Sequence, residues 1–312
     1  MGKAKRSAET MSALDFFRRF PGETAARRFI EQAVWDEGMP VCPSCRSRKH
    51  GRWKARPGHY RCKRCRKIYT VRIGTIFESS RIPLHKWLYA IYLLQTARKG
   101  ISSLQLSKEL GVTQRSAWFL LHRLREACGL EALPLSGKVE VDETFVGGKE
   151  MNKHQHKKLN AGRGTVGKQP VLGMRERGGR VVAMPVAGVD AATLTRQISQ
   201  AVETGSTIYT DEHRGYDGLS SVFHGHERVN HSAREFVNGM AHTNGIESVW
   251  AILKRGFNGV YHHWSVKHCR RYVNEFAFRL NDGNCQIDTI DRIEAVVRSA
   301  AGKRLTYHRL TQ

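Results

Sequence analysis

The spacing of hydrophobic residues changes partway along the chain. In the first part, apolar side chains recur every three or four positions, which predicts amphipathic helices. One is expected within residues 13–37, starting after Pro21, and others over 83–99 and 114–127. Later, apolar and polar residues alternate in short runs bounded by glycine, which is typical of strands. Residues 138–257 therefore predict the element order β-β-β-α-β-β-α.

Four of the seven cysteines form the pattern C-x2-C-x16-C-x2-C, at Cys42, Cys45, Cys62 and Cys65. Each C-x2-C pair presents two thiolates to one ion, and two pairs complete a tetrahedron, as in structural zinc ribbons. Because four thiolates leave no open coordination position, this metal is expected to hold structure and do no chemistry. The alternative is four unrelated buried cysteines.

The chain carries a large excess of positive charge, with 52 Lys and Arg against 28 Asp and Glu and a net charge of +24. Such an excess predicts a polyanionic partner, most simply nucleic acid. Twelve basic residues and no acidic residue lie from Arg46 to Arg72, around the cysteines. We expect Arg61, Lys63 and Arg64 to contact DNA there. A merely solvated basic face is the alternative.

Two predicted helices joined by a short turn precede the alternating region. "LSKELG" ends a helix at Gly111, "GVT" makes the turn, and the second helix is the one over 114–127. This is the form of a helix-turn-helix, whose second helix can enter the major groove of DNA. On that interpretation Gln114, Arg115 and Arg123 lie near DNA. A purely structural helical hairpin has the same pattern.

Three carboxylates occupy positions where predicted elements meet. Asp142 is expected to end the first strand, Asp211 the fourth, and Glu247 to lie in the first turn of the following helix. If the two strands are adjacent, three converging carboxylates can bind two divalent ions, and oxygen ligands favour Mg²⁺ or Mn²⁺. The neighbours Glu143 and Glu212 should point to the opposite face, because side chains alternate along a strand.

Each carboxylate also has an ordinary interpretation. Glu247 could pair with Asn244 in a capping-box-like helix start. Asp142 and Asp211 could be turn residues. The capping role explains Glu247 alone, so it does not account for two further Asp residues at predicted strand ends.

The motifs "VDETFVGGK", "YTDEHRGY" and "HTNGIESVWAILKRGFNGVYHHWSVKHCRRYVNEFAFRLN" lie behind a CPxC…CxxC ribbon. In sequence and in order these motifs resemble those of the DDE transposases of one bacterial insertion-sequence family. Members of that family combine an N-terminal zinc ribbon with a ribonuclease H-like catalytic domain. The resemblance runs from about residue 13 to residue 282.

The resemblance implies roles for individual residues. Asp142, Asp211 and Glu247 become the metal ligands, and Lys254, with its neighbour Arg255, becomes the basic contact beside the DNA end. Some subgroups of the family have Asn in place of the third acidic residue. Here the spacing of 35 residues after the second Asp, and the Lys seven residues later, favour Glu247 over Asn244, which lies three residues before it.

The function implied is that of a Mg²⁺-dependent DNA transposase. It would bind double-stranded insertion-sequence ends, cleave phosphodiester bonds and transfer the strand to target DNA, using two Mg²⁺ (or Mn²⁺) ions and one structural Zn²⁺. A homodimer or higher synaptic assembly is expected. The alternatives are a non-catalytic DNA-binding regulator built from the ribbon and helix-turn-helix, or a ribonuclease H-like nuclease without strand transfer.

No apolar run in the sequence reaches the roughly 18 residues of a membrane-spanning helix, or forms a signal peptide. We therefore expect a cytoplasmic, nucleoid-associated protein with no membrane partner.

The expected fold is α/β, with a ribonuclease H-like mixed-sheet catalytic domain preceded by a small zinc ribbon and a helical, helix-turn-helix-like region. The segments are an N-terminal tail and helix (1–37), the zinc ribbon (38–78), the helical region (79–132), the catalytic domain (133–282) and a C-terminal tail (283–312).

Overall fold

The computed structural model describes residues 8–53, 55–129, 133–148, 150–159, 164–229 and 243–312. The chain forms two compact units. Unit 1 comprises Met1–Gly129 with Asp282–Gln312, and unit 2 comprises Leu130–Asn281. No helix in these described ranges is long and apolar enough to cross a membrane.

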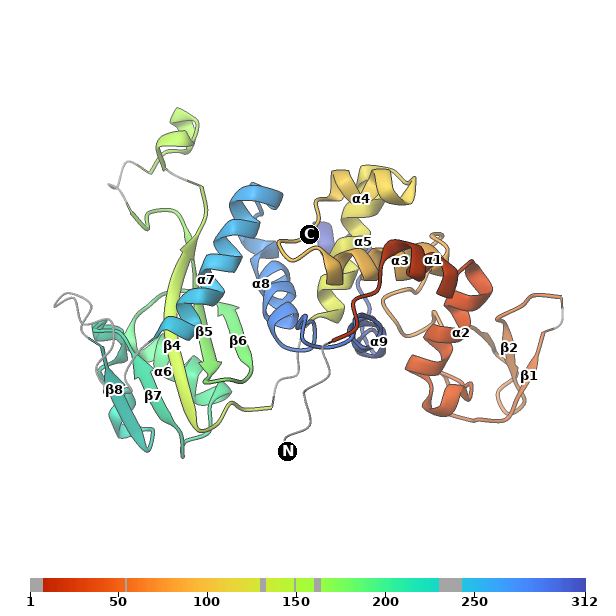
Figure 1. Ribbon diagram of the computed structural model, residues 1–312, viewed down its shortest axis with the longest axis horizontal. Coiled ribbons are helices and arrows are strands. Elements are labelled where there is room, and N and C mark those ends of the chain that lie inside the picture. The colour runs from red at the N-terminus through yellow and green to blue at the C-terminus, as the bar shows by residue number, and fades with distance from the viewer. Residues whose placement is uncertain (1–7, 54, 130–132, 149, 160–163, 230–242) are drawn as a thin grey trace, which may run out of the picture. The chain divides into compact units, whose positions relative to one another are not determined.

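Unit 1 combines a small antiparallel sheet, in the order β1-β2-β3, with a set of helices (Figure 1). Its elements are α1 (Ala13–Arg19), α2 (Glu23–Val34), β1 (His50–Arg52), β2 (Tyr60–Cys62), β3 (Ile68–Tyr69), α3 (Leu84–Thr96), α4 (Ser103–Leu110), α5 (Gln114–Ala127), α9 (Thr289–Ser299) and α10 (Tyr307–Thr311).

The N-terminal segment holds two helices where one was expected. The predicted helix after Pro21 is α2, which follows Gly22 as its N-cap. A separate helix, α1, comes before it and ends at Arg19. Proline disfavours helical backbone at the residue before it, so Pro21 separates the two.

The hairpin of α4 and α5 has the predicted form. Gly111 ends α4 in the left-handed conformation, at φ +58°, which glycine adopts without steric cost. The Thr113 hydroxyl then accepts the backbone N–H of Ser116 and caps α5. The turn between two buried helix faces is therefore encoded locally.

The C-terminal segment, which was expected to be a tail, forms helices of unit 1. α9 packs against α2, α3 and α5. Its residues Ile293, Val296 and Val297 are fully buried, at the spacing of one helix face. The Arg292 guanidinium donates to the carbonyl of Gln95 on α3 at 2.9 Å. The segment thus completes the core of the N-terminal unit across a long sequence separation.

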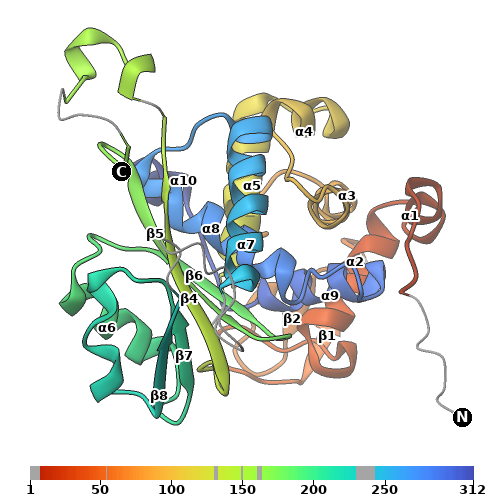
Figure 2. The same cartoon turned by 60° about the vertical axis from the view of Figure 1, so that its left-hand side comes forward.

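Unit 2 is a five-stranded mixed sheet in the order β6-β5-β4-β7-β8, with helices on both faces (Figure 2). β4 is antiparallel to β5 and parallel to β7. This order confirms the predicted β-β-β-α-β-β-α sequence and the α/β class. The elements are β4 (Lys138–Val146), β5 (Gln169–Glu176), β6 (Val181–Pro185), α6 (Ala191–Ala201), β7 (Thr207–Thr210), β8 (Gly225–Arg228), α7 (Asn244–Gly256) and α8 (Val266–Leu280).

The two faces of the sheet bury different sets of side chains. Val139 and Val141 of β4 join the core under α6. The residues between and beside them, Glu140 and Asp142, bond to α7 on the other face. This period-2 alternation is the pattern read from the sequence, and it places acidic groups under α7.

Candidate functional site

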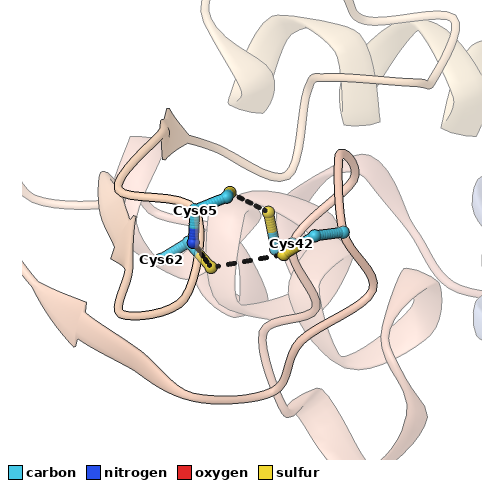
Figure 3. A group of neighbouring side chains, drawn as sticks. Cys42, Cys62 and Cys65 are labelled. Atoms are coloured by element: carbon cyan, nitrogen blue, oxygen red, sulfur yellow. Dashed lines mark hydrogen bonds between the residues drawn. The ribbon is translucent and has the colours of Figure 1, made fainter.

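The four cysteines of the predicted ribbon lie together in unit 1. Their sulfur atoms are all within 4.8 Å of one another. The Sγ atoms of Cys42 and Cys65 are 3.5 Å apart (Figure 3). Those of Cys45 and Cys62 are 3.6 Å apart. The Cys65 backbone N–H donates to the Cys62 sulfur at 3.4 Å. This bond, the Arg64 backbone N–H and the neighbouring thiols together lower the pKa of the Cys62 thiol to about 6. This set of sulfur donors fits one tetrahedral structural Zn²⁺.

The ribbon has only a thin apolar core beside the cysteines. The rings of Tyr60 and Tyr69 stack with centroids 5.7 Å apart, and Trp35 packs edge-on against Tyr60 at 5.4 Å. Short strands with so little apolar packing need an additional constraint, which a metal tied to both knuckles supplies.

The basic residues of the ribbon lie mostly on its surface. Of the twelve between Arg46 and Arg72, ten are exposed, including Arg61, Lys63 and Arg64. Arg72 is an exception, because its guanidinium donates to the carbonyls of Ser80 and Ile82 within unit 1. Lys54 lies outside the described residues. The exposed set presents one sign of charge to solvent, as a phosphate-binding surface requires.

The first turn of α5 exposes Gln114 and Arg115, as the helix-turn-helix interpretation requires. The prediction that Arg123 also lies near DNA is wrong. Its side chain is buried, with Nη2 donating to the Glu78 carbonyl at 2.6 Å and Nε to the Leu305 carbonyl at 3.0 Å. Arg123 lies on the inner face of α5, where it ties other segments of unit 1 to the helix.

Asp142 lies in the middle of β4, so the expectation that it ends the strand is wrong: the ladder with β5 continues to Val146. The Trp250 indole N–H on α7 donates to Asp142 Oδ2 at 2.8 Å, and the Glu143 backbone N–H donates to Oδ1 at 2.8 Å. Burial, together with the negative charges of Glu143 and Asp211, raises the pKa of Asp142 to about 7.

Asp211 directly follows β7, the parallel neighbour of β4, as predicted. In the register between these strands, Glu140 is opposite Tyr209, so Asp142 and Asp211 lie two residues further along the same direction. The His213 backbone N–H donates to Asp211 Oδ1 at 3.0 Å and turns the chain away from the strand. The two aspartates are close enough for one charge to shift the other's pKa.

Glu247 is in the first turn of α7 and is exposed. The Thr243 hydroxyl donates to its Oε1 at 3.1 Å. Thr243, and not Asn244, is the N-cap of α7, so the capping-box pairing of Glu247 with Asn244 is absent. Among the described residues, the four cysteines form a group of potential ligands within 4.8 Å, whereas Asp142, Asp211 and Glu247 do not.

A residue that the sequence analysis missed, Glu140, anchors α7 to the sheet. Its carboxylate is buried, accepts the backbone N–H of Ile246 at 2.9 Å, and pairs with Arg177 Nε at 3.1 Å. A negative group at a helix N-terminus is favourable because it satisfies an N–H that has no partner within the helix. Gly245 leaves room for it, since a Cβ there would meet the carboxylate.

Gly173 of β5 is a second residue that the sequence analysis did not single out. It pairs with Asp142 across the ladder. A Cβ at this position would lie 2.5 Å from Cζ2 of Trp250 and 2.9 Å from Cδ1 of Ile246. The absence of a side chain therefore lets the indole lie against β5 on the α7 face of the sheet and reach the Asp142 carboxylate.

Glu143 points to the face opposite Asp142, as the alternation predicts. It accepts a hydrogen bond from the Tyr216 hydroxyl, which belongs to the core under α6. Burial and the Glu143 charge raise the pKa of Tyr216, so that phenol stays protonated and keeps donating. Glu143 thus supports the site from behind the sheet.

Lys254 and Arg255 lie in the last turn of α7, and both are exposed. Seven helical residues at about 100° each bring Lys254 onto the same face as Glu247, two turns further along. This face of α7 therefore offers an acidic group at one end and basic groups at the other.

Comparison with known proteins identifies the family to which this chain belongs. Residues 134–281 match the family described as ISXO2-like transposase domain, and residues 21–68 match the transposase zinc-ribbon domain. The chain is 30% identical over 252 residues to a Halobacterium salinarum protein named "Uncharacterized protein in transposable element ISH50", covering 76% of this chain and 84% of that protein. The chain therefore belongs to the insertion-sequence transposases that join a zinc ribbon to an ISXO2-like transposase domain.

Proposed function

We propose that this transposase binds the ends of its insertion sequence, cleaves phosphodiester bonds there and joins the freed 3'-hydroxyl to target DNA. The observation that carries the proposal is that Asp142 lies on β4 beneath α7, the helix that bears Glu247, and that Asp211 directly follows the adjacent parallel strand β7. These three residues are the proposed catalytic set.

The donor set fits hard divalent cations. Asp142, Asp211 and Glu247 supply carboxylate oxygens, which Mg²⁺ and Mn²⁺ prefer. Burial, together with the negative charges of Glu143 and Asp211, raises the pKa of Asp142, and a bound cation would offset that negative charge. When bound, two such ions would activate the attacking oxygen and stabilise the leaving oxygen of a phosphoryl transfer.

The protein's own residues orient and support this set. The Trp250 indole and the Glu143 backbone N–H each hold one oxygen of Asp142, which fixes the carboxylate plane. Glu140 fixes the start of α7, which carries Glu247. Lys254 and Arg255 are the proposed contacts to the phosphates beside the cleaved bond, because they are exposed cations on the helix that bears Glu247.

DNA binding is proposed to divide between two surfaces of unit 1. The exposed ribbon residues Arg61, Lys63 and Arg64 would contact phosphates, which adds affinity for any sequence. Gln114 and Arg115 on α5 would read base edges in the major groove. Because two element ends must be held together for strand transfer, the proposal includes a homodimer or larger synaptic assembly.

The test is an assay with duplex DNA that carries the element's ends. We expect nicking and joined products in Mg²⁺ or Mn²⁺, and neither with a chelator. Specific binding without cleavage would overturn the proposal in favour of a DNA-binding regulator. Cleavage without joined products would overturn it in favour of a nuclease. Light scattering with and without end DNA would check the assembly.

A further inference from the structure

The last residues of the chain lie along α5, the proposed recognition helix. Leu305 and Leu310 are buried, and the buried Arg123 of α5 donates to the Leu305 carbonyl at 3.0 Å. Lys303 Nζ donates to the carbonyl of Ala127 at the end of α5, at 3.0 Å. The backbone at Leu305 and the side chain of Lys303 are therefore tied to the helix.

This anchoring holds Tyr307 against the first turn of α5. The Arg115 Nε–H donates to the Tyr307 hydroxyl at 3.0 Å. The Arg115 Cζ atom lies 4.7 Å from the centre of the Tyr307 ring, and Phe119 supports that ring edge-on at 5.4 Å. One phenol thus contacts the guanidinium by a hydrogen bond and by a cation–π interaction.

The contact bears on what Arg115 can do next. A guanidinium has five N–H donors in a rigid plane, and the bond to Tyr307 uses the one on Nε. Among the described residues, no hydrogen bond from Nη1 or Nη2 of Arg115 is formed with another side chain or carbonyl. Two parallel N–H groups of this kind match O6 and N7 of guanine in the major groove.

We propose that Tyr307 is a positioning residue for sequence recognition, holding Arg115 so that its Nη1 and Nη2 edge reads a guanine of the element end. The proposal rests on the proposed function, in which α5 enters the major groove. Arginine has a long flexible side chain, so holding it in place before DNA arrives reduces the freedom lost on binding. The C-terminal segment would then take part in specificity through α5.

The test measures binding of the full-length protein to an end duplex and to a scrambled duplex, with discrimination defined as the ratio of the two Kd values. Tyr307→Phe keeps the ring and removes the hydroxyl, so discrimination should fall by about five- to tenfold, the size of one net hydrogen bond. Arg115→Ala should lower it by about ten- to a hundredfold. Binding to scrambled DNA should change little in Tyr307→Phe.

Two further measurements separate positioning from a general structural role. In the Arg115→Ala background, Tyr307→Phe should cause no additional loss of discrimination. Each guanine of the end duplex can be replaced in turn by 7-deazaguanine, which lacks N7. At one position this replacement should weaken binding of the wild-type protein but not of Arg115→Ala. Tyr92→Phe is the matched control, because its hydroxyl also donates within unit 1, to the Met11 carbonyl at 3.2 Å, away from Arg115.

The outcomes are distinguishable. Unchanged discrimination in Arg115→Ala would overturn the recognition role of α5 and, with it, this inference, while the cleavage assay would still stand. A loss in Arg115→Ala with none in Tyr307→Phe would overturn the role of Tyr307 alone. Equal losses from Tyr307→Phe in both backgrounds would make Tyr307 merely structural. Tighter binding of Tyr307→Phe to the end duplex would mean that Tyr307 hinders the contact between Arg115 and DNA, and would overturn the positioning role.

Discussion

The ribbon and the acidic site of unit 2 are both built from groups that bind cations, but they reach their geometry differently. In the ribbon, four sulfur atoms from two short knuckles already lie within 4.8 Å of one another. In unit 2, Asp142 lies on a strand, Asp211 directly follows the neighbouring strand, and Glu247 lies on a helix. Trp250 orients Asp142, and Glu140 holds the start of the helix.

This difference in construction matches the role proposed for each site, structural in the ribbon and catalytic in unit 2. A closed thiolate set binds its metal as part of folding. The acidic site instead rests on a sheet that has its own core on each face. Its proposed ligands can therefore be exposed, as Glu247 is, and still be held by a stable scaffold. Folding of the ribbon should therefore depend on its metal. In unit 2, catalysis should depend on metal, whereas folding should not.

The largest expected effect is on catalysis. Asp142→Asn, Asp211→Asn and Glu247→Gln should each lower cleavage and strand transfer by about a thousandfold or more, and the losses should not add, because the residues act as a unit. DNA binding and the fold of unit 2 should be nearly unchanged. Rates of nicking and joining on end DNA check this.

Asn244→Ala is the control for the third ligand, since Asn244 neighbours Glu247 at the start of α7. It should retain most activity. If Asn244→Ala is inactive and Glu247→Gln is active, the third ligand is Asn244.

The next effect is on the ribbon. Structural zinc in such modules is worth about 10–16 kcal/mol of apparent binding energy, more than this small apolar core provides. Cys45→Ser should therefore remove zinc, unfold residues 41–72 and weaken end binding, while unit 2 stays folded. Zinc analysis measures the loss of metal, and hydrogen exchange measures the unfolding of residues 41–72 and the persistence of unit 2.

Cys285→Ser is the matched control, because Cys285 is an exposed cysteine of unit 1 outside the ribbon. Its zinc content should equal that of the wild type. A Cys45→Ser protein with a protected ribbon would contradict the metal dependence, and so would wild-type protein that contains no zinc when purified without chelator.

A smaller effect tests the packing that orients the acidic site. Gly173→Ala places a Cβ 2.5 Å from Cζ2 of Trp250, and overpacking of this kind costs about 1–3 kcal/mol. It should lower both the stability of unit 2 and the cleavage rate, because Trp250 moves off Asp142. Thermal unfolding and nicking rates measure the two losses.

Gly205→Ala is the control in unit 2, since a Cβ there has no neighbour within 4 Å. It should behave like the wild type. In Gly173→Ala, a second change of Trp250→Leu should recover stability but not activity, because leucine relieves the clash and cannot donate to Asp142. Recovery of both would mean that the indole bond is dispensable.

The smallest expected effect concerns charge on the ribbon. Replacing Arg61, Lys63 and Arg64 by Gln should flatten the salt dependence of binding by up to about three units and weaken all sequences alike. Replacing Gln114 and Arg115 should instead reduce discrimination, with a smaller change in slope. Titrations at several salt concentrations decide between them. If the ribbon variant loses specificity and the α5 variant does not, the two surfaces have exchanged roles.

Features that depend on neighbours in the chain could be predicted from the sequence alone. The spacing of Cys42, Cys45, Cys62 and Cys65 was enough to predict one cluster, because each knuckle is a short loop. Gly111 was enough to end α4, because its backbone conformation is local. The strand and helix order of unit 2 followed from hydrophobic periodicity, which each segment carries in itself.

The positions of the proposed ligands were only partly predictable. Alternation correctly placed Asp142 and Glu143 on opposite faces of β4, and strand adjacency brought Asp211 beside β4. The position of Asp142 within β4 was predicted wrongly, because the strand continues beyond it to Val146 in its ladder with β5. Whether the three carboxylates act together stays a prediction for the assays above.

Other features were decided only by the tertiary structure, since burial and partnership depend on which distant segments pack together. Arg123 looks like any basic residue on an amphipathic helix until the C-terminal segment covers it. Glu140 becomes the anchor of α7 only when residues 106 positions apart meet. Gly173 is needed because Trp250 and Ile246 of α7 pack directly over it. The amino-acid sequence specifies the local backbone geometry of each segment, whereas contacts between distant residues form only when the hydrophobic cores assemble.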